Sequence, residues 1–217
     1  MAVITGTSGA DTLADTSGND TVNGGSGGFD IVNGGDGRDT LAFMAATSAV
    51  VVDFVAGTAG NTSFTSIERV ITGDFNDRLT GNAAAQNLTA RAGADTLAGG
   101  GGVDTLWGGA GADTFIFREA GTANADTIGD WTSGSDEIEL DNAAMAALGA
   151  DGDFAAGDTR FWASSTGTAH DADDRVIYNT NTRSLYYDAD GNGSGAAQLI
   201  ATVQAGAMIA ATDISII

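Results

Sequence analysis

Apolar residues recur at every ninth position in the middle of the chain, between Thr72 and Ile116. They are Leu79, Leu88, Leu97, Leu106 and Phe115. Two positions before them stand Asp77, Gln86, Asp95, Asp104 and Asp113, and the residues before those are rich in glycine. The unit reads G-G-x-G-x-D-x-U-x, where U is apolar. Three residues with a central apolar side chain fit a very short strand, so the pattern predicts turns and strands in alternation.

The turns have the composition of a cation site. Glycine adopts φ > 0 without a Cβ clash, so G-G-x-G-x permits a tight turn whose carbonyls converge, and the aspartate adds a carboxylate. Calcium takes about six to eight oxygen ligands in irregular geometry, whereas magnesium demands a near-octahedral shell and retains water. The turns therefore favour calcium.

Two units make one coil, so residues 18 apart should stack along the coil axis. This spacing places Asp77 beside Asp95, Asp95 beside Asp113, and Gln86 beside Asp104. Stacked carboxylates repel each other without a cation between them, so calcium binding and folding should be one coupled event. We expect the repeats to be largely unfolded without calcium.

The repeat is looser between Gly6 and Ala42, where one unit carries an extra residue. Residues 43–71 interrupt it with two β-branched stretches, 50–55 and 67–71, which predict longer strands that continue the roll with wider turns. We interpret this segment as a structural spacer, with a functional pocket as the alternative.

After Phe117 the glycine-rich units stop and most of the aromatic residues appear. The patterns predict strands at 126–131 and 136–140, a short helix at 141–148, a hairpin from 175–179 and 184–188, and a strand at 196–203. We interpret this part as a separate packing unit that caps the roll. The predicted organisation is a first repeat block, interrupting strands, a second repeat block and a capping unit, at 1–42, 43–71, 72–117 and 118–217.

Composition narrows the classes of function. The formal net charge of -21 over 217 residues makes nucleic acid and anionic membranes poor partners. The chain has no Cys, which excludes disulfides and Cys-zinc sites. No apolar run is long enough for a membrane-spanning helix, and the opening residues lack the pattern of a Sec-type signal. Weak calcium sites are typical of extracellular modules, so calcium ligation points outside the cell.

Catalytic motifs are not found in the sequence. His170 is the only histidine and there is no Lys, so an H-E-x-x-H zinc site, a P-loop and Schiff-base chemistry cannot be built. Residues 188–193 match the first half of an EF-hand loop, but Leu199 stands where the bidentate Glu belongs. An Asx-rich turn is at least as good an interpretation of that loop. The sequence thus predicts a protein that is not an enzyme.

In this order of segments the chain resembles the C-terminal region of RTX (hemolysin-type) calcium-binding proteins, as found in serralysin-like proteases and alphaproteobacterial secreted proteins. The resemblance rests on the two blocks of nonapeptides and on closing segments such as Leu185-Tyr186-Tyr187-Asp188. It implies an all-β fold, a right-handed parallel β-roll with a β-rich C-terminal cap. It also implies export by type I secretion through an uncleaved C-terminal signal, to which Asp213-Ile214-Ser215-Ile216-Ile217 is similar.

The resemblance also implies a set of calcium ligands. In the family, one turn supplies two carbonyls and its Asp, and the turn 18 residues further on supplies two more carbonyls and its Asp. The implied sets are Thr7, Gly9 and Asp11 with Gly24, Ser26 and Asp30; Thr16, Gly18 and Asp20 with Gly34, Asp36 and Asp39; Gly73, Phe75 and Asp77 with Ala90, Ala92 and Asp95; Arg91, Gly93 and Asp95 with Gly108, Ala110 and Asp113; and Gly100, Gly102 and Asp104 with Asp126. Gln86 departs from the pattern, because its amide brings no charge.

The predicted function is that of a secreted, non-enzymatic calcium-binding β-roll protein that folds outside the cell when calcium binds. Its expected partners are calcium ions and the type I secretion machinery. Other functions are left open. One is a calcium-dependent self-assembling or adhesive protein of the cell surface or matrix. Another is the carrier portion of a secreted hydrolase whose catalytic domain is absent, or a polysaccharide site within residues 141–174.

Overall fold

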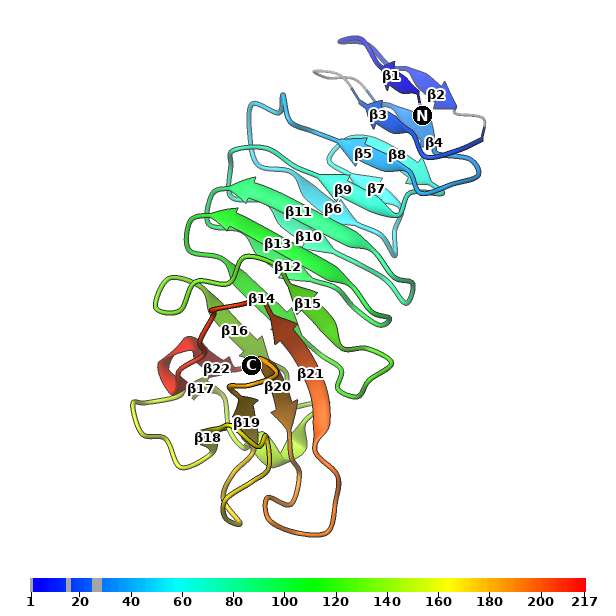
Figure 1. The fold of residues 1–217 in the computed structure, drawn as a ribbon. Coiled ribbons are helices and arrows are strands. Elements are labelled where there is room, and N and C mark those ends of the chain that lie inside the picture. Colours follow the sequence, from blue (N-terminus) through cyan, green and yellow to red (C-terminus); the bar gives the residue numbers. More distant parts are fainter. Residues whose placement is uncertain (1, 15–16, 25–28) are drawn as a thin grey trace.

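The computed structural model describes residues 2–14, 17–24 and 29–217. Within them, short strands are stacked like rungs from the N-terminus to the C-terminus, and they form two eleven-stranded sheets (Figure 1). We call these sheet A and sheet B. Sheet A has the order β1 (Val3–Thr5), β3 (Thr21–Asn23), β5 (Thr40–Ala42), β9 (Arg69–Ile71), β11 (Asn87–Ala92), β13 (Thr105–Ala110), β15 (Asp126–Ile128), β21 (Gln198–Val203), β20 (Ser184–Tyr187), β19 (Val176–Asn179) and β18 (Phe161–Ser164). Sheet B has the order β17 (Gly152–Asp153), β22 (Ile214–Ile216), β16 (Glu137–Leu140), β14 (Thr114–Phe117), β12 (Thr96–Ala98), β10 (Arg78–Thr80), β6 (Val51–Asp53), β7 (Thr58–Ala59), β8 (Thr62–Thr65), β4 (Ile31–Asn33) and β2 (Thr12–Ala14).

Successive nonapeptides go to alternate sheets, so that two of them complete one coil. β10 pairs with β12 in parallel, with Leu79 opposite Leu97, and β11 pairs with β13, with Leu88 opposite Leu106. Both pairings join residues two nonapeptides apart, as the stacking argument predicts. The all-β fold with parallel strands is therefore confirmed.

The apolar position of the repeat forms the core between the two sheets. Leu79, Leu88, Leu97, Leu106 and Phe115 are fully buried. Burying an aliphatic side chain of this size contributes about 1.5–3 kcal/mol, so each rung of the roll adds its own share. The hydrophobic cluster continues without a break through β15, β16, β21 and β22, and these strands extend both sheets beyond the repeats.

The segment 43–71 continues the roll, but its strands are shorter than predicted. β6 covers only Val51–Asp53, because the Asp53 carboxylate accepts hydrogen bonds from the N–H groups of Val55 and Ala56 and turns the chain. β7 and β8, which the sequence pattern did not predict, then form an antiparallel meander with β6 inside sheet B. β9 lies in sheet A between β5 and β11.

The predicted helix at 141–148 is wrong, and only Ala146–Leu148 forms a 3-10 helix. Met145 leaves helical geometry, and both Met145 and Leu148 are buried in the core. A helix of this length is marginal without tertiary contacts, so core packing decides the local conformation. The predicted hairpin is confirmed, since β19 and β20 pair antiparallel. Among the described residues, no helix is long and apolar enough to cross a membrane.

Candidate metal centre

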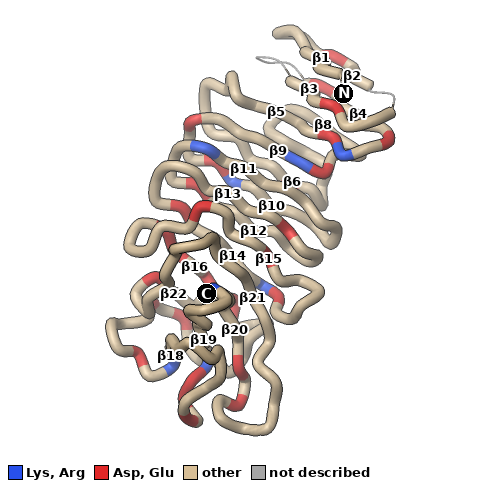
Figure 2. Tube along the Cα trace, in the orientation of Figure 1, with Lys and Arg blue, Asp and Glu red and all other residues tan. Residues whose placement is uncertain are grey.

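Stacked turns are joined by a ladder of carboxylates. The inner oxygen Oδ1 of each turn aspartate accepts a hydrogen bond from the backbone N–H of the equivalent residue one coil earlier. The Asp95 carboxylate accepts from Asp77 at 2.6 Å, the Asp113 carboxylate from Asp95 at 2.9 Å, and the Asp104 carboxylate from Gln86 at 2.7 Å. Acidic residues consequently follow the turns at the edges of the roll (Figure 2).

The ladder extends beyond the second repeat block in both directions. Asp126 accepts from the Asp104 N–H at 2.9 Å, and Asp136 accepts from the Asp113 N–H at 3.1 Å. In the first block, Asp30 accepts from Asp11 and Asp39 accepts from Asp20, with a spacing of 19 residues because of the extra residue. All these side chains except Asp11 are buried.

The outer oxygen of the same side chain distinguishes two kinds of turn. In the first kind, this oxygen accepts a hydrogen bond from the N–H of the second turn residue. These bonds run from Thr7 to Asp11 at 2.6 Å, from Gly73 to Asp77 at 3.3 Å, from Asn82 to Gln86 at 3.2 Å and from Thr132 to Asp136 at 2.7 Å. We call the turns 6–11, 72–77, 81–86 and 131–136 closed turns.

In the second kind, the outer oxygen Oδ2 is buried and has no hydrogen-bond partner. Among the described residues this holds for Asp39, Asp95, Asp104 and Asp113. In each of these turns the second and fourth residues both have φ > 0: Gly35 and Gly37, Arg91 and Gly93, Gly100 and Gly102, and Gly109 and Gly111. We call the turns 34–39, 90–95, 99–104 and 108–113 open turns.

Backbone geometry explains why the two kinds differ. The peptide plane between the first and second turn residues can have two orientations, related by a rotation of about 180°. This rotation swaps the positions of its N–H and C=O groups and changes the sign of φ at the second residue, as between type I and type II β-turns. In a closed turn this N–H points to the side chain and donates a hydrogen bond to its outer oxygen. In an open turn the N–H is turned away, so the outer carboxylate oxygen is left without a donor.

Glycine is required in the open turns for reasons of space as well as of φ. A Cβ at Gly109 would overlap the carbonyl oxygen of Arg91, and one at Gly111 would overlap the carbonyl oxygen of Gly93. Arg91 itself has φ 88° without being a glycine. Left-handed backbone of this kind costs of order 1–3 kcal/mol for a residue with a side chain, so the surrounding contacts hold Arg91 in place.

Burial makes the ionised forms of Asp95, Asp104 and Asp126 unfavourable. Burial is the main cause that raises the pKa of Asp95 to about 6, with the charges of Asp113 and Asp77 adding to it. Burial likewise raises the pKa of Asp104 to about 6, and that of Asp126 to about 8, where the Asp104 and Glu119 charges contribute. A divalent cation would reverse this penalty, because it neutralises the carboxylates it binds.

The predicted set around Arg91 and Gly108 fits a calcium ion well. It lies between two open turns, 90–95 and 108–113, which contribute the unpartnered oxygens of Asp95 and Asp113. The Ala110 carbonyl accepts a hydrogen bond from the Gly93 N–H at 3.0 Å, and its second lone pair is left for a ligand. Calcium would add a hard, oxygen-preferring charge here, held by the carbonyls and carboxylates of these two turns.

The structure also brings Asp104 and Asp126 together, as predicted. A side chain at Gly99 would clash with the outer oxygens of both, so the two oxygens face the same space. The predicted set around Asp20 and Asp39 has one open turn, 34–39. There Gly18 donates its N–H to the Asp36 carbonyl at 2.7 Å, and Asp39 supplies the unpartnered oxygen.

All the predicted ligand sets stay predictions, and two of them involve closed turns. Asp11 and Asp77 have their outer oxygens occupied by N–H groups, which leaves them less able to ligate an ion. The Ala90 carbonyl, a predicted ligand, accepts the Thr72 hydroxyl at 3.1 Å. Ala92 donates its N–H to Gly73, and the Phe75 carbonyl lies against Gly93. The predicted ligands Thr16 and Ser26 lie outside the described residues.

Sequence reasoning missed several acidic residues that the turns use. Glu68 accepts the Asp39 N–H at 2.9 Å, and Asp130 accepts the N–H groups of Gly108 and Gly109. Asp136 continues the ladder after a spacing of 23 residues, which hides it from a strict period. The signal was present, because Asp136-Glu137-Ile138 has the same acidic and apolar spacing as the repeat.

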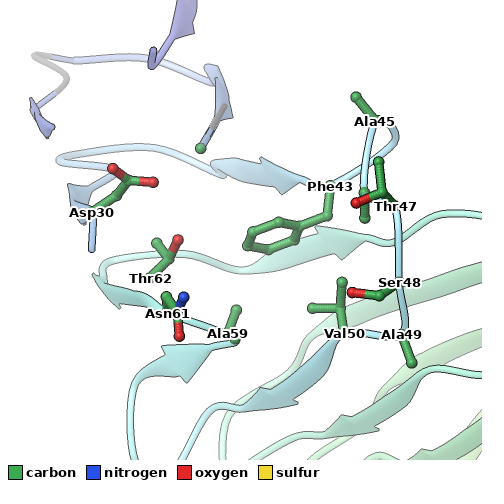
Figure 3. Close-up of a pocket in the computed structure, with 13 residues that line it drawn as sticks. Asp30, Phe43, Ala45, Thr47, Ser48, Ala49, Val50, Ala59, Asn61 and Thr62 are labelled. Atoms are coloured by element: carbon green, nitrogen blue, oxygen red, sulfur yellow. The ribbon is translucent and has the colours of Figure 1, made fainter. Parts of the chain in front are cut away.

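A cavity of about 320 Å³ lies in the segment interpreted as a spacer, between residues 43–50 and the β7–β8 turn. Phe43 and Val50 border it on one side, and Asp30 and Thr62 on another (Figure 3). Because Asp30 belongs to the carboxylate ladder, this cavity adjoins the predicted calcium set of the first block rather than forming a separate site.

The remaining candidate groups are His170 with its neighbours and the loop at 188–193. His170 is exposed, pairs with Asp171 at 3.2 Å and stacks on Trp162. With Asp174 these residues form a small acidic and imidazole group, but Asp174 already accepts two backbone N–H groups. The loop at 188–193 is held as an Asx turn, in which Asp188 accepts from the Asp190 N–H at 3.1 Å.

Comparison with known proteins agrees with this geometry. The family described as the RTX calcium-binding nonapeptide repeat matches four copies, over residues 5–41 and 80–115. The chain carries RTX calcium-binding repeats. The matched residues include all four open turns, and RTX repeats are typical of extracellular proteins that leave the cell by type I secretion.

Among solved structures, the chain is similar to the extracellular lipase LipA from Serratia marcescens. The two sequences are 18% identical, the match covers 96% of this chain and 38% of the lipase, and the TM-score is 0.29. The chain thus spans little more than a third of the length of that protein. No curated protein sequence matches the chain.

Proposed function

We propose that this RTX protein is secreted without a catalytic role, and that calcium, bound first of all at the open turns, drives its folding outside the cell. The observation that carries the proposal is the set of four buried carboxylate oxygens without a partner, on Asp39, Asp95, Asp104 and Asp113. An unpaired buried anion costs several kcal/mol, so the folded roll needs a cation that the unfolded chain does not.

Two features support a non-enzymatic role. His170, the only histidine, is exposed on a loop, and among the described residues its side chain pairs only with Asp171 and Trp162. The turn aspartates are engaged in the ladder, and Asp174 and Asp188 accept hydrogen bonds from backbone N–H groups. Calcium here is accordingly a structural ion, and the protein acts through what its folded surface binds.

The C-terminal tail supports export before folding. The residues that resemble a type I signal, Asp213 to Ile217, include β22, which pairs with β16 on one side and β17 on the other. Asp213, Ile214 and Ile216 are buried. A signal of this kind can be read only in the unfolded chain, so low cytosolic calcium would keep the tail accessible to the secretion machinery.

Far-UV circular dichroism of chelated protein, titrated with calcium and separately with magnesium, tests the folding proposal. We expect a cooperative transition from coil to β-structure with calcium alone. A chelated protein that is already folded, and on which calcium has no effect, would overturn it.

Export is tested separately in a cell that carries a type I secretion system. Deleting residues 213–217 should keep the protein inside the cell, whereas the full chain should reach the medium. The double variant Ile214→Asp, Ile216→Asp separates the two roles of the tail. Loss of calcium-induced folding with secretion retained would show that the tail acts in the core and not as a signal.

A further inference from the structure

The outer face of sheet A carries a row of polar side chains that runs across the strands. In each strand the residue before the buried apolar position points outward, and the register places these residues side by side. Thr40 lies opposite Arg69, and Arg69 lies opposite Asn87. The row consists of Thr21, Thr40, Arg69, Asn87, Thr105, Thr127 and Thr202.

Two arginines that form no ion pair with a described residue lie in or beside the N-terminal half of this row. Arg38 and Arg69 are both exposed and line a groove of about 290 Å³ together with Asn19, Thr21, Thr40 and Asn87. The one carboxylate in the groove, Asp20, is buried and accepts the N–H of Ala2. The ion pairs among the described residues involve other cations, namely Arg118, Arg160 and His170. Both guanidinium groups are therefore available to an anion from outside.

A flat aromatic surface lies on the same face. Trp107 on β13 is 43% exposed. Its ring lies over the backbone of Gly129, since a Cβ at Gly129 would meet three ring atoms at 2.5–2.7 Å. The ring is thus laid against the sheet, and its other side faces solvent. Trp107 and Arg69 are two strands apart, a separation of about 10 Å across the sheet.

We propose that this face binds a linear polysaccharide that carries carboxylates, such as a polymer of uronic acids. Each guanidinium presents a planar fork that matches a carboxylate. The hydroxyl and amide groups of the row match sugar hydroxyls, and the exposed Trp107 ring offers a surface for the apolar face of a sugar ring. A nucleic acid carries about one charge per 1.7 Å of duplex, and two cations on a strongly acidic protein do not match that density.

Sheet B differs from sheet A in the charges on its outer face. Its outer face has one arginine, Arg78, at the equivalent position of β10. The same face also carries Asp53, Glu137 and Glu139, which would repel a polyanion. The polar row of sheet A contains no carboxylate among its members. The two faces of the same roll are thus expected to differ in their affinity for an acidic polymer.

Titration calorimetry of the calcium-loaded full chain with hyaluronan oligosaccharides, which carry a carboxylate on alternate sugars, tests the proposal. We expect binding that weakens with added salt, and neutral dextran should bind much more weakly. The double variant Arg38→Ala, Arg69→Ala should weaken hyaluronan binding about tenfold, as loss of two partly exposed charge pairs implies. Trp107→Ala should weaken it as well, and in the parent protein the sugar should change tryptophan fluorescence.

Arg78→Ala is the matched control, because it removes one arginine from the corresponding position of the opposite face. It should leave hyaluronan affinity within about twofold of the parent protein. Circular dichroism with calcium confirms that each variant is folded. The proposal is overturned if hyaluronan does not bind at millimolar concentration, if dextran binds as well, if Arg78→Ala matches the double variant, or if an oligonucleotide binds more tightly than hyaluronan.

Discussion

The neighbouring turns 81–86 and 90–95 have the same place in the repeat but opposite character. In the closed turn 81–86, the Gln86 side chain accepts the Asn82 N–H and is satisfied by the protein itself. In the open turn 90–95, the second and fourth residues have φ > 0, and the outer oxygen of Asp95 is buried with no partner. A calcium site in this roll therefore depends on the backbone of the turn as much as on its carboxylate.

Open and closed turns should differ most at glycines whose φ must be positive. Gly111, the fourth residue of the open turn 108–113, has φ 149° and no room for a Cβ beside Gly93. Gly111→Ala should lower the free energy of unfolding in calcium by about 2–3 kcal/mol, since alanine cannot adopt the conformation without strain. Thermal unfolding with calcium present measures the loss.

Gly9→Ala is the matched substitution at the fourth residue of a closed turn. A Cβ at Gly9 would have its closest contact at 3.7 Å, with the Thr7 hydroxyl, and no positive φ is needed. Its effect should stay below about 1 kcal/mol. Equal losses from the two substitutions would contradict the distinction between open and closed turns.

Asp104 and Gln86 are neighbours in one ladder and allow a comparison of side chains. Asp104→Ala removes an unpartnered buried oxygen from an open turn and should raise the calcium concentration at the folding midpoint by about tenfold. Gln86→Ala removes a side chain that is already hydrogen bonded, so it should lower stability with little change in calcium dependence. Calcium titrations followed by circular dichroism distinguish the two. A calcium dependence that shifts equally in both variants would count against the assignment.

The response to pH should have opposite signs with and without calcium. Asp95 and Asp104 have pKa values raised to about 6, and Asp126 to about 8, above the ordinary value of 3.8. A raised pKa of a carboxyl favours the folded state below the unfolded pKa, and that contribution is lost as pH rises through the folded pKa. Chelated protein should therefore gain structure as the pH falls from about 8 to about 4.

Calcium-loaded protein should lose affinity for the ion over the same range, because protons compete for the carboxylates. Circular dichroism and calcium titrations at several pH values measure both effects. A chelated protein that is most ordered at high pH would show that the buried carboxyls do not control its folding.

The smallest expected effect comes from Arg91, which adopts φ 88° in an open turn. Arg91→Gly removes the backbone strain of a non-glycine residue with positive φ, but it increases the conformational entropy of the unfolded chain. We expect a net gain of about 0.5–1 kcal/mol in calcium, measured by thermal unfolding. Arg78→Gly, a substitution in β10 with ordinary backbone, should instead lose stability.

The repeat, the parallel coils and the stacking of Asp77 on Asp95 could be predicted because a period of nine residues fixes both the core positions and the register. Whether a turn is open or closed could be predicted from the sequence only in part. Glycine at both the second and fourth positions marks three open turns, but Arg91 adopts the same backbone without glycine. No sequence pattern reveals that the neighbouring turns force it there.

Outside the repeat, tertiary contacts determine more of the local structure. The helix predicted for 141–148 fails because Met145 and Leu148 are drawn into the core. Asp130 and Asp136 join the turns after insertions that break the period. Residues of this kind act through contacts between distant segments, and a one-dimensional period does not report such contacts.

The structure leads us to expect that calcium binds at the open turns in preference to the closed ones. A crystal structure grown in calcium, with ions located by their anomalous scattering, would show where the ions bind. We expect ions beside the outer oxygens of Asp39, Asp95, Asp104 and Asp113, and none beside Asp77 or Gln86. Ions bound equally at closed and open turns, or absent from the open ones, would contradict this expectation.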